Sequence, residues 1–167
     1  GASCTTAWDS TASRSHFGAG SLKVSKNSTG NGYVGWLKHI YNLSPGDYTL
    51  SVYVNTGGNK LAGSGIRAKI DVFNGAGTYD FSSFSQFVLQ TDTSEWVRLE
   101  VSFTVEEEGR INAGVEMLTE TTGTAWVDDM QVERANTAGS FNLLENTELK
   151  STSYWTAGNT PAVATIS

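Results

Sequence analysis

Apolar and polar residues alternate along much of the chain with a period of two, the pattern expected of β-strands that bury one face. The clearest example runs from Val97 to Val105, where Val, Leu, Val, Phe and Val alternate with Arg, Glu, Ser and Thr. The same alternation occurs at 50–54, 66–73 and 111–117. One side of each segment is therefore expected to face a core and the other side to face water.

Further strands are predicted where apolar or aromatic residues lie between turn-forming residues. These segments are 21–25, 33–41, 84–89 and 124–132. The sequence Ser-Pro-Gly-Asp at 44–47 predicts a turn. No stretch repeats apolar residues at helical spacing between capping residues, so no long helix is expected. Short strands throughout favour an all-β fold, a two-sheet antiparallel β-sandwich with jelly-roll topology.

The alternation ends after Glu133, where small and polar residues follow. Residues 135–140 have the composition of a linker, which predicts one sandwich module over 1–134. Residues 141–167 contain Phe, Tyr and Trp and end in an alternating stretch, so they are apolar enough to seek burial. We expect this tail either to complete the sandwich with a missing strand or to start a following module, and we favour completion.

Composition narrows the range of partners. The 167 residues include 17 acidic and 11 basic side chains, a net charge of −6 that argues against a nucleic-acid ligand. A single cysteine, Cys4, excludes an intramolecular disulfide and a cysteine-based zinc site. No apolar run reaches the roughly 20 residues of a membrane-spanning helix, so no membrane partner is expected. The first residues lack a signal-peptide pattern, and we expect the chain to be part of a longer protein.

Four phrases of the sequence carry a family resemblance. They are SHFGAGSLKV at 15–24, NLSPGDYTLSVYV at 42–54, SEWVRL at 94–99 and TAWVDDMQVE at 124–133. In this order they resemble the galactose-binding-like, carbohydrate-binding jelly-roll modules of families four, nine and twenty-two, and modules of Gram-positive surface proteins that carry RHS or YD repeats. The resemblance covers nearly the whole chain. It implies a non-catalytic module that binds polysaccharide in a secreted or cell-surface, extracellular protein, beside neighbouring modules of the same polypeptide.

Carbohydrate recognition uses aromatic rings that stack on sugar rings and polar side chains that hydrogen-bond their hydroxyl groups. The predicted wet faces supply such side chains, and Lys69, His39 and Asn112 project from them. The candidate ligand-binding residues are Tyr33, Arg67, Asp71, Tyr79, Phe84, Gln86, Glu116 and Trp126. The alternative for each ring is a place in the core, where most aromatic residues of sandwiches lie. Burial is the expectation for Trp36 and Trp96.

Two adjacent acids, Asp128 and Asp129, interrupt an apolar strand, where an uncompensated carboxylate would be costly to bury. Because neighbouring strand residues point to opposite faces, we expect one to cap turn amides and the other to bind calcium with backbone carbonyls. The resemblance implies a structural calcium that also contacts the 16–20 turn and a glutamate in the first strand. Lys150 stands where that glutamate is expected, so plain hydrogen bonding is an equal alternative.

No catalytic motif is found in the sequence. The two histidines, His16 and His39, have no obvious Ser or Asp partner nearby, and the chain lacks a nucleophile elbow, a phosphate loop and a paired-His motif. The chain is therefore not expected to be an enzyme, since a hydrolase or lyase would need an acid pair in a cleft. The alternative to polysaccharide binding is a structural or adhesive spacer module of a cell-surface repeat protein, with no small ligand. Exposed aromatic rings on a wet face would favour sugar, and short polar side chains alone would favour a spacer.

Overall fold

A computed structural model describes residues 4–29, 33–59, 61–85, 94–118, 120–134, 156–160 and 165–166. These residues form β-strands joined by turns, with one short 3-10 helix, η1. The elements are β1 (Cys4–Asp9), η1 (Ala12–Arg14), β2 (Ser21–Lys26), β3 (Tyr33–Leu43), β4 (Gly46–Asn55), β5 (Ile66–Asn74), β6 (Tyr79–Phe84), β7 (Val97–Val105), β8 (Gly109–Met117), β9 (Gly123–Glu133), β10 (Thr156–Thr160) and β11 (Thr165–Ile166).

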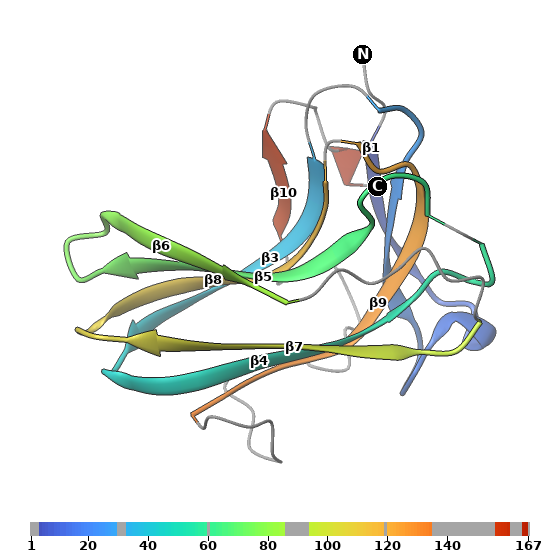
Figure 1. Ribbon diagram of the computed structural model, residues 1–167. Coiled ribbons are helices and arrows are strands. Elements are labelled where there is room, and N and C mark those ends of the chain that lie inside the picture. Colours follow the sequence, from blue (N-terminus) through green and yellow to red (C-terminus); the bar gives the residue numbers. More distant parts are fainter. Residues whose placement is uncertain are drawn as a thin grey trace.

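The strands form two sheets that lie one above the other (Figure 1). The six-stranded sheet has the order β11-β1-β2-β9-β4-β7, and the five-stranded sheet has the order β10-β3-β8-β5-β6. Every pair is antiparallel except β1 with β11. Strands that follow one another in the chain pass repeatedly from one sheet to the other. The predicted antiparallel β-sandwich with jelly-roll topology is therefore confirmed.

The core lies between the two sheets and is made of alternate side chains. On β7, Leu99, Val101 and Phe103 are buried while the residues between them are exposed, as the alternation predicted. On β5 and β8, the apolar positions from Ile66 and from Ile111 onward are also buried. Because these positions fill the interior, the polar positions of the same strands are left on the outer faces.

One predicted strand is misplaced. The segment 84–89 was expected to be a strand, but β6 ends at Phe84, and 86–93 lie outside the described residues. The turn after β5 explains the shift. Asn74 N donates to Thr78 O at 3.0 Å, and Thr78 N donates to the side-chain Oδ1 of Asn74 at 2.9 Å. The chain therefore reverses at once, and the next strand begins at Tyr79.

Strand β1 has no counterpart among the predicted strands, because its apolar residues Cys4, Ala7 and Trp8 do not alternate with polar ones. It pairs with β2 along its whole length, from Cys4 opposite Lys26 to Asp9 opposite Ser21. Backbone hydrogen bonding to an existing strand thus specifies β1, with Trp8 packed against the core.

Two short strands of the tail pair with the sheets. Strand β10 is antiparallel to β3, and β11 is parallel to β1. The predicted linker 135–140 and most of 141–167 lie outside the described residues, so the division of the chain into domains stays a prediction. Within the described residues, no helix is long and apolar enough to cross a membrane.

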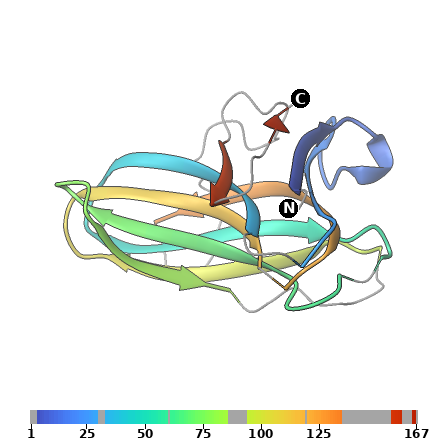
Figure 2. The same cartoon turned by 90° about the horizontal axis from the view of Figure 1, so that it is seen from above.

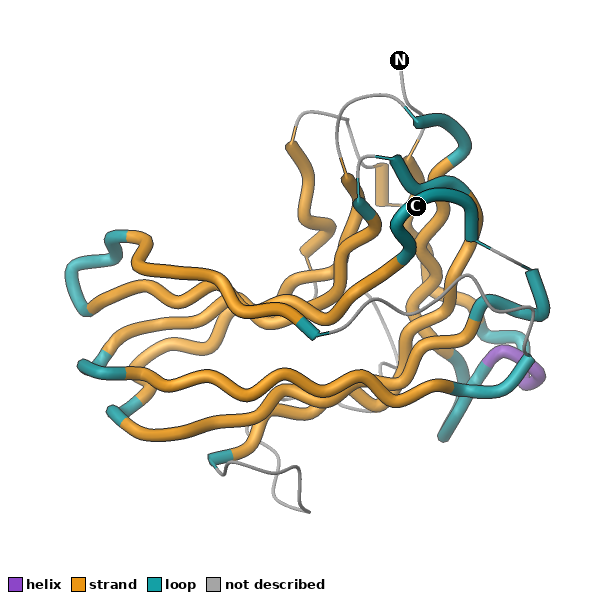
Figure 3. The backbone as a smooth tube through the Cα atoms, in the orientation of Figure 1, coloured by secondary structure: helices purple, strands orange, loops and turns teal. Residues whose placement is uncertain are grey.

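The turns that join β3 to β4, β5 to β6, and β7 to β8 gather at one end of the sandwich (Figure 3). The short 3-10 helix η1 lies at the opposite end.

Candidate functional site

The outer face of the five-stranded sheet carries most of the candidate residues (Figure 2 views this sheet from above). Strand register places their side chains in rows that cross the sheet. One row runs His39, Asn112, Asp71 and Ser82 across β3, β8, β5 and β6. Adjacent positions on these strands complete the surface, which we call the β5–β8 face. Its residues are His39, Arg67, Lys69, Asp71, Tyr79, Ser82, Phe84, Asn112 and Glu116.

The centre of the β5–β8 face is a set of paired charges. Glu116 is only 2% exposed, and its Oε1 accepts a hydrogen bond from Arg67 Nε at 2.5 Å. Lys69 Nζ lies 3.5 Å from Glu116 Oε2 and 3.3 Å from Asp71 Oδ1. A carboxylate this deeply buried needs such cationic partners. Two cations and two anions balance, so the centre of the face is close to neutral.

Further polar contacts lie on both sides of this polar centre. Ser82 Oγ donates to Asp71 Oδ1 at 2.5 Å, and the Tyr79 hydroxyl lies 2.9 Å from Ser82 Oγ. On the other side, His39 Nδ1 is in contact with Asn112 Oδ1. One network on β5, β6 and β8 and a separate contact between β3 and β8 therefore fix the positions of these donors and acceptors.

Aromatic rings flank the polar centre on β6. Tyr79 is 54% exposed and Phe84 is 41% exposed. The Arg67 guanidinium lies over the Phe84 ring, 3.4 Å from its centroid, and the ring of Phe73 meets Tyr79 edge-on at 5.8 Å. These contacts hold both rings in place while leaving much of their surface open to solvent.

The structure brings five of the eight candidate ligand-binding residues together on the β5–β8 face: Arg67, Asp71, Tyr79, Phe84 and Glu116. Tyr33 begins β3 of the same sheet, but its side chain and the whole of Gln86 lie outside the described residues. Lys69, His39 and Asn112 share the face, as their alternation predicted. Ser82 was missed, although it stands two residues before Phe84 and therefore on the same side of a strand.

Trp126 lies elsewhere, on β9 of the six-stranded sheet. It is 7% exposed, and the Arg14 guanidinium covers its ring at 4.3 Å from the centroid. Its Nε1 donates to Asp9 Oδ2 at 2.7 Å. Partial burial raises the pKa of Asp9, but hydrogen bonds from Thr11 and Trp126 outweigh it and hold this pKa below its ordinary value. Trp126 is thus covered by the connection between β1 and β2 (residues 10–20, which we call the first turn) and does not belong to the β5–β8 face.

The pair Asp128 and Asp129 lies on the same sheet as Trp126, and its geometry differs from the expectation. A β-bulge occurs here, because β4 and β9 shift register between Ser51 and Tyr53, and Asp129 has a φ of 47°. The extra residue brings both acids to one turn instead of to opposite faces. Asp128 Oδ2 accepts His16 N at 2.8 Å, and Asp129 Oδ2 meets His16 Nδ1 at 2.5 Å.

Asp128 is fully buried and surrounded by hydrogen-bond donors. Its Oδ2 accepts from the backbone N–H groups of His16 and Phe17 and from Ser15 Oγ, and its Oδ1 accepts from Asp129 N. Burial raises the pKa of Asp128, and the amide donors oppose that rise. One acid therefore caps turn amides, as predicted.

A calcium ion does not fit the donor set around Asp128, because the N–H and O–H hydrogens that point at its oxygens would repel a cation. No group of three or more His, Cys, Asp or Glu residues able to hold a metal is found in the described part of the chain. Lys150 lies outside that part. This misfit concerns Asp128, the acid that caps the turn, and structural calcium at the other acid, Asp129, stays a prediction. Hydrogen bonding is the arrangement that the contacts of Asp128 describe.

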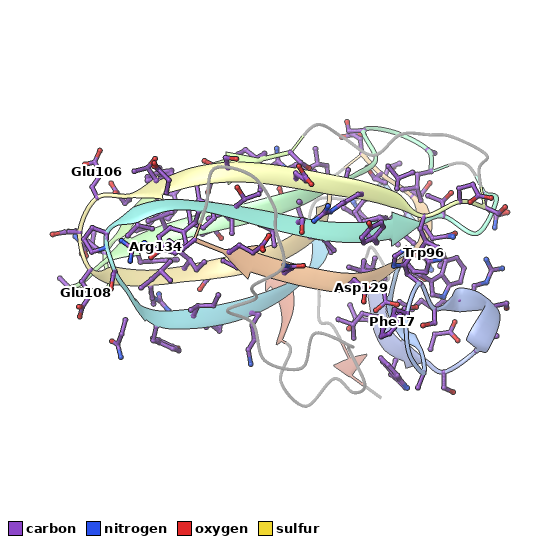
Figure 4. The ribbon with its side chains drawn as sticks, turned by 90° about the horizontal axis from the view of Figure 1, so that it is seen from below. Phe17, Trp96, Glu106, Glu108, Asp129 and Arg134 are labelled. Carbon is purple, nitrogen blue, oxygen red and sulfur yellow. The ribbon has the colours of Figure 1, made fainter. Side chains whose placement is uncertain are left out.

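Trp96 was expected to be buried, but it is only partly buried and immediately precedes β7. Its ring meets His16 edge-on at 5.6 Å, and His16 stacks on Tyr53 at 3.9 Å. Figure 4 shows Trp96, Phe17 and Asp129 near one another at the end opposite Glu106 and Glu108. Trp96 therefore packs against His16 of the first turn and is not part of the core. The side chain of Trp36 lies outside the described residues.

Comparison with known proteins places this architecture among solved β-sandwich domains. No protein-family model and no curated protein matches the chain. Solved structures that match it include carbohydrate-binding modules, and the likeness is one of fold.

Three of the matching structures illustrate this likeness. The carbohydrate-binding modules of a β-sandwich superfamily, solved to explain promiscuous specificity, match at a TM-score of 0.57 and 17% identity, over 79% of this chain and 54% of theirs. TmCBM61 in complex with β-1,4-galactotriose matches at 0.51 and 17% identity, over 80% of this chain and 87% of its own. The enzymatically active domain of tailspike protein 4 of bacteriophage CBA120 matches at 0.58 and 10% identity, over 80% of this chain. This chain spans only 19% of that domain and about half, 54%, of the first.

Proposed function

We propose that this chain is a non-catalytic module that binds a glycan chain, such as a polysaccharide, on the β5–β8 face. The observation that carries the proposal is the pairing of exposed rings with a fixed polar centre. Tyr79 and Phe84 offer surface for the apolar side of a sugar ring. Beside them, the planar guanidinium of Arg67 can bind neighbouring hydroxyl groups, while the buried carboxylates of Glu116 and Asp71 hold the cations of the face in place.

The charge of the face favours a neutral glycan over an acidic one. Arg67 and Lys69 are both within reach of Glu116, and Lys69 also reaches Asp71. An acidic sugar would have to compete with these carboxylates for the same cations. Hydroxyl groups can instead share the existing network as additional donors and acceptors. A shallow face of this kind binds its ligand weakly. Repetition of the module along a longer secreted or surface protein would raise the overall affinity for the glycan.

The shared fold supports this proposal by analogy only. The β-sandwich modules that match the chain include TmCBM61, solved with β-1,4-galactotriose. Fold alone does not decide function, so the argument depends on the side chains of the face.

The alternative, a spacer without a small ligand, is less well supported. A spacer would need only short polar side chains on its outer face, whereas Tyr79 and Phe84 are large, apolar and exposed. A hydrolase would need an acid pair able to exchange protons in a cleft. The acids of the face, Asp71 and Glu116, are each paired with a cation.

The experiment is a glycan array, followed by affinity electrophoresis of variants on the polysaccharides that bind. Phe84→Ala removes an exposed ring and should abolish retardation of the protein while its melting temperature changes little. Phe17→Ala is the matched control, because Phe17 is exposed in the turn that leads into β2 of the other sheet, and its loss should not affect retardation. Absence of binding across neutral plant and bacterial glycans, or equal effects of the two variants, would refute the proposal.

A further inference from the structure

A pocket of about 370 Å³ lies at the end of the sandwich where the three turns gather. Its lining includes Tyr41, Asn42, Asn74, Gly77, Glu108 and Arg110. Register connects this pocket with the β5–β8 face, because Arg110 pairs with Phe73 one row beyond Asn112 and Asp71. None of the candidate ligand-binding residues from the sequence lines it.

The polar groups of this pocket differ from those of the β5–β8 face. Within the described part of the chain, the guanidinium of Arg110, the hydroxyl of Tyr41 and the amide of Asn42 make no hydrogen bond or ion pair. Arg110 is nevertheless held in place, because its guanidinium stacks on the Phe73 ring at 4.0 Å from the centroid. Its in-plane N–H donors are thus positioned for an acceptor that this part of the protein does not supply.

The walls of the pocket are fixed by the backbone. The 74–78 turn is closed by hydrogen bonds, including Gly77 N to Asn74 O at 2.8 Å. A Cβ at position 109 would collide with Phe73 O, so Gly109 lets the neighbouring strands approach closely. A Cβ at Gly77 would meet nothing within 4 Å, so the space beside this residue is open. Because the walls of the pocket are preformed, binding of a small ligand does not incur the entropy cost of ordering them.

The lining points to a sugar as the ligand. The volume of about 370 Å³ falls in the range of small-molecule pockets. Tyr41 is 63% exposed and offers a ring for stacking. Arg110 and Asn42 supply donors, and Glu108 supplies a carboxylate that can accept from hydroxyl groups.

Charge restricts the kind of sugar. Glu106 and Glu107 stand beside Glu108 in the same turn, and all three are exposed. Their negative field opposes a sugar that carries a carboxylate. We propose that this pocket is a second subsite that binds the neutral terminal sugar residue of a glycan. Its link to a longer glycan rests on the proposed function of the β5–β8 face.

The test is an NMR titration of the ¹⁵N-labelled full chain with free glucose, galactose, mannose and xylose, and with glucuronate as the charged counterpart. At least one neutral sugar should shift the backbone amides of Asn42, Gly77 and Gly109 with millimolar affinity. Glucuronate should bind more weakly. Asn42→Gly removes the amide and keeps the positive φ of 55° without strain, so it should weaken binding about fivefold, the effect of one lost hydrogen bond.

Tyr41→Ala should weaken binding by a similar or larger factor. Phe17→Ala is the control, because the two rings are equally exposed, at 63%, and Phe17 lies in the turn that leads into β2 of the other sheet. Dispersed spectra of each variant establish that it is folded.

The outcomes separate the two proposals. If polysaccharide retention depends on Phe84 while no neutral sugar shifts Asn42 or Gly77, the second subsite is refuted and the β5–β8 proposal survives. If the pocket amides shift but Phe84→Ala retains full glycan binding, the subsite is supported and the β5–β8 proposal is refuted. Tighter binding of glucuronate than of every neutral sugar would overturn the assignment of a neutral ligand.

Discussion

Replacement of Glu116 by Gln is the sharpest test of the polar centre of the β5–β8 face. The substitution keeps the shape of the side chain and one acceptor oxygen but removes its charge. Arg67 and Lys69 both contact this carboxylate, so the variant leaves their positive charges without their shared partner, with Asp71 still near Lys69. The remaining cations then repel each other at a site that is largely shielded from water.

The size of the effect follows from burial. Breaking a buried ion pair by removing one partner costs about 3–5 kcal/mol. The side chains of Arg67 and Lys69 are 19% and 12% exposed, so both can partly reach water, and the lower end of that range applies. A loss of about 3 kcal/mol corresponds to a fall in melting temperature of about 6–12 °C for a protein of this size.

The assay is differential scanning calorimetry together with urea unfolding, which should show a lower midpoint at an unchanged slope. The matched control is Glu100→Gln on β7, where Glu100 pairs with Arg98 at 3.3 Å but is 47% exposed. An exposed pair of this kind contributes less than about 1 kcal/mol. If Glu116→Gln costs no more stability than Glu100→Gln, Glu116 is not the buried anchor of the face and the reasoning fails.

Three further predictions concern the other sheet and the tail. The folded-state pKa of Asp9 lies below its ordinary value, so its stabilising contribution is present above about pH 4 and is lost as the pH falls through the lowered pKa. Trp126→Phe removes one donor to Asp9, so unfolding midpoints measured between about pH 5 and 2 should depend less on pH than in the parent, and an equal dependence would contradict this account. Excess EDTA should leave the melting temperature unchanged, whereas Asp128→Ala should lower it, because four donors lose their acceptor; a large fall with EDTA, restored by calcium, would contradict the hydrogen-bonded arrangement. Deletion of 141–167 should lower the melting temperature, because β10 and β11 pair with β3 and β1, and an unchanged value would show that the tail does not complete this sandwich.

Local alternation accounts for much of what could be predicted. The side-chain direction of a strand residue is set by its own backbone, so a period of two identifies the positions that point away from the core without knowledge of the neighbouring strand. This is why Arg67, Asp71 and Glu116 were correctly assigned to an outer face. The prediction from alternation failed where the backbone departs from the regular strand repeat, as at the bulge that brings Asp128 and Asp129 to the same turn.

The sequence by itself determined that this chain forms strands, that they pack as two layers, and which side chains each strand turns away from the core, although Asn112 and Glu116 on β8 are buried and do not face water as predicted. Only the tertiary structure decided which of those side chains meet. Arg67 and Glu116 are neighbours because β5 pairs with β8 in one particular register, and Trp126 is covered because the first turn lies over β9. Pairing between distant strands depends on how the whole core fills, and that information is spread over many residues rather than present in any one segment.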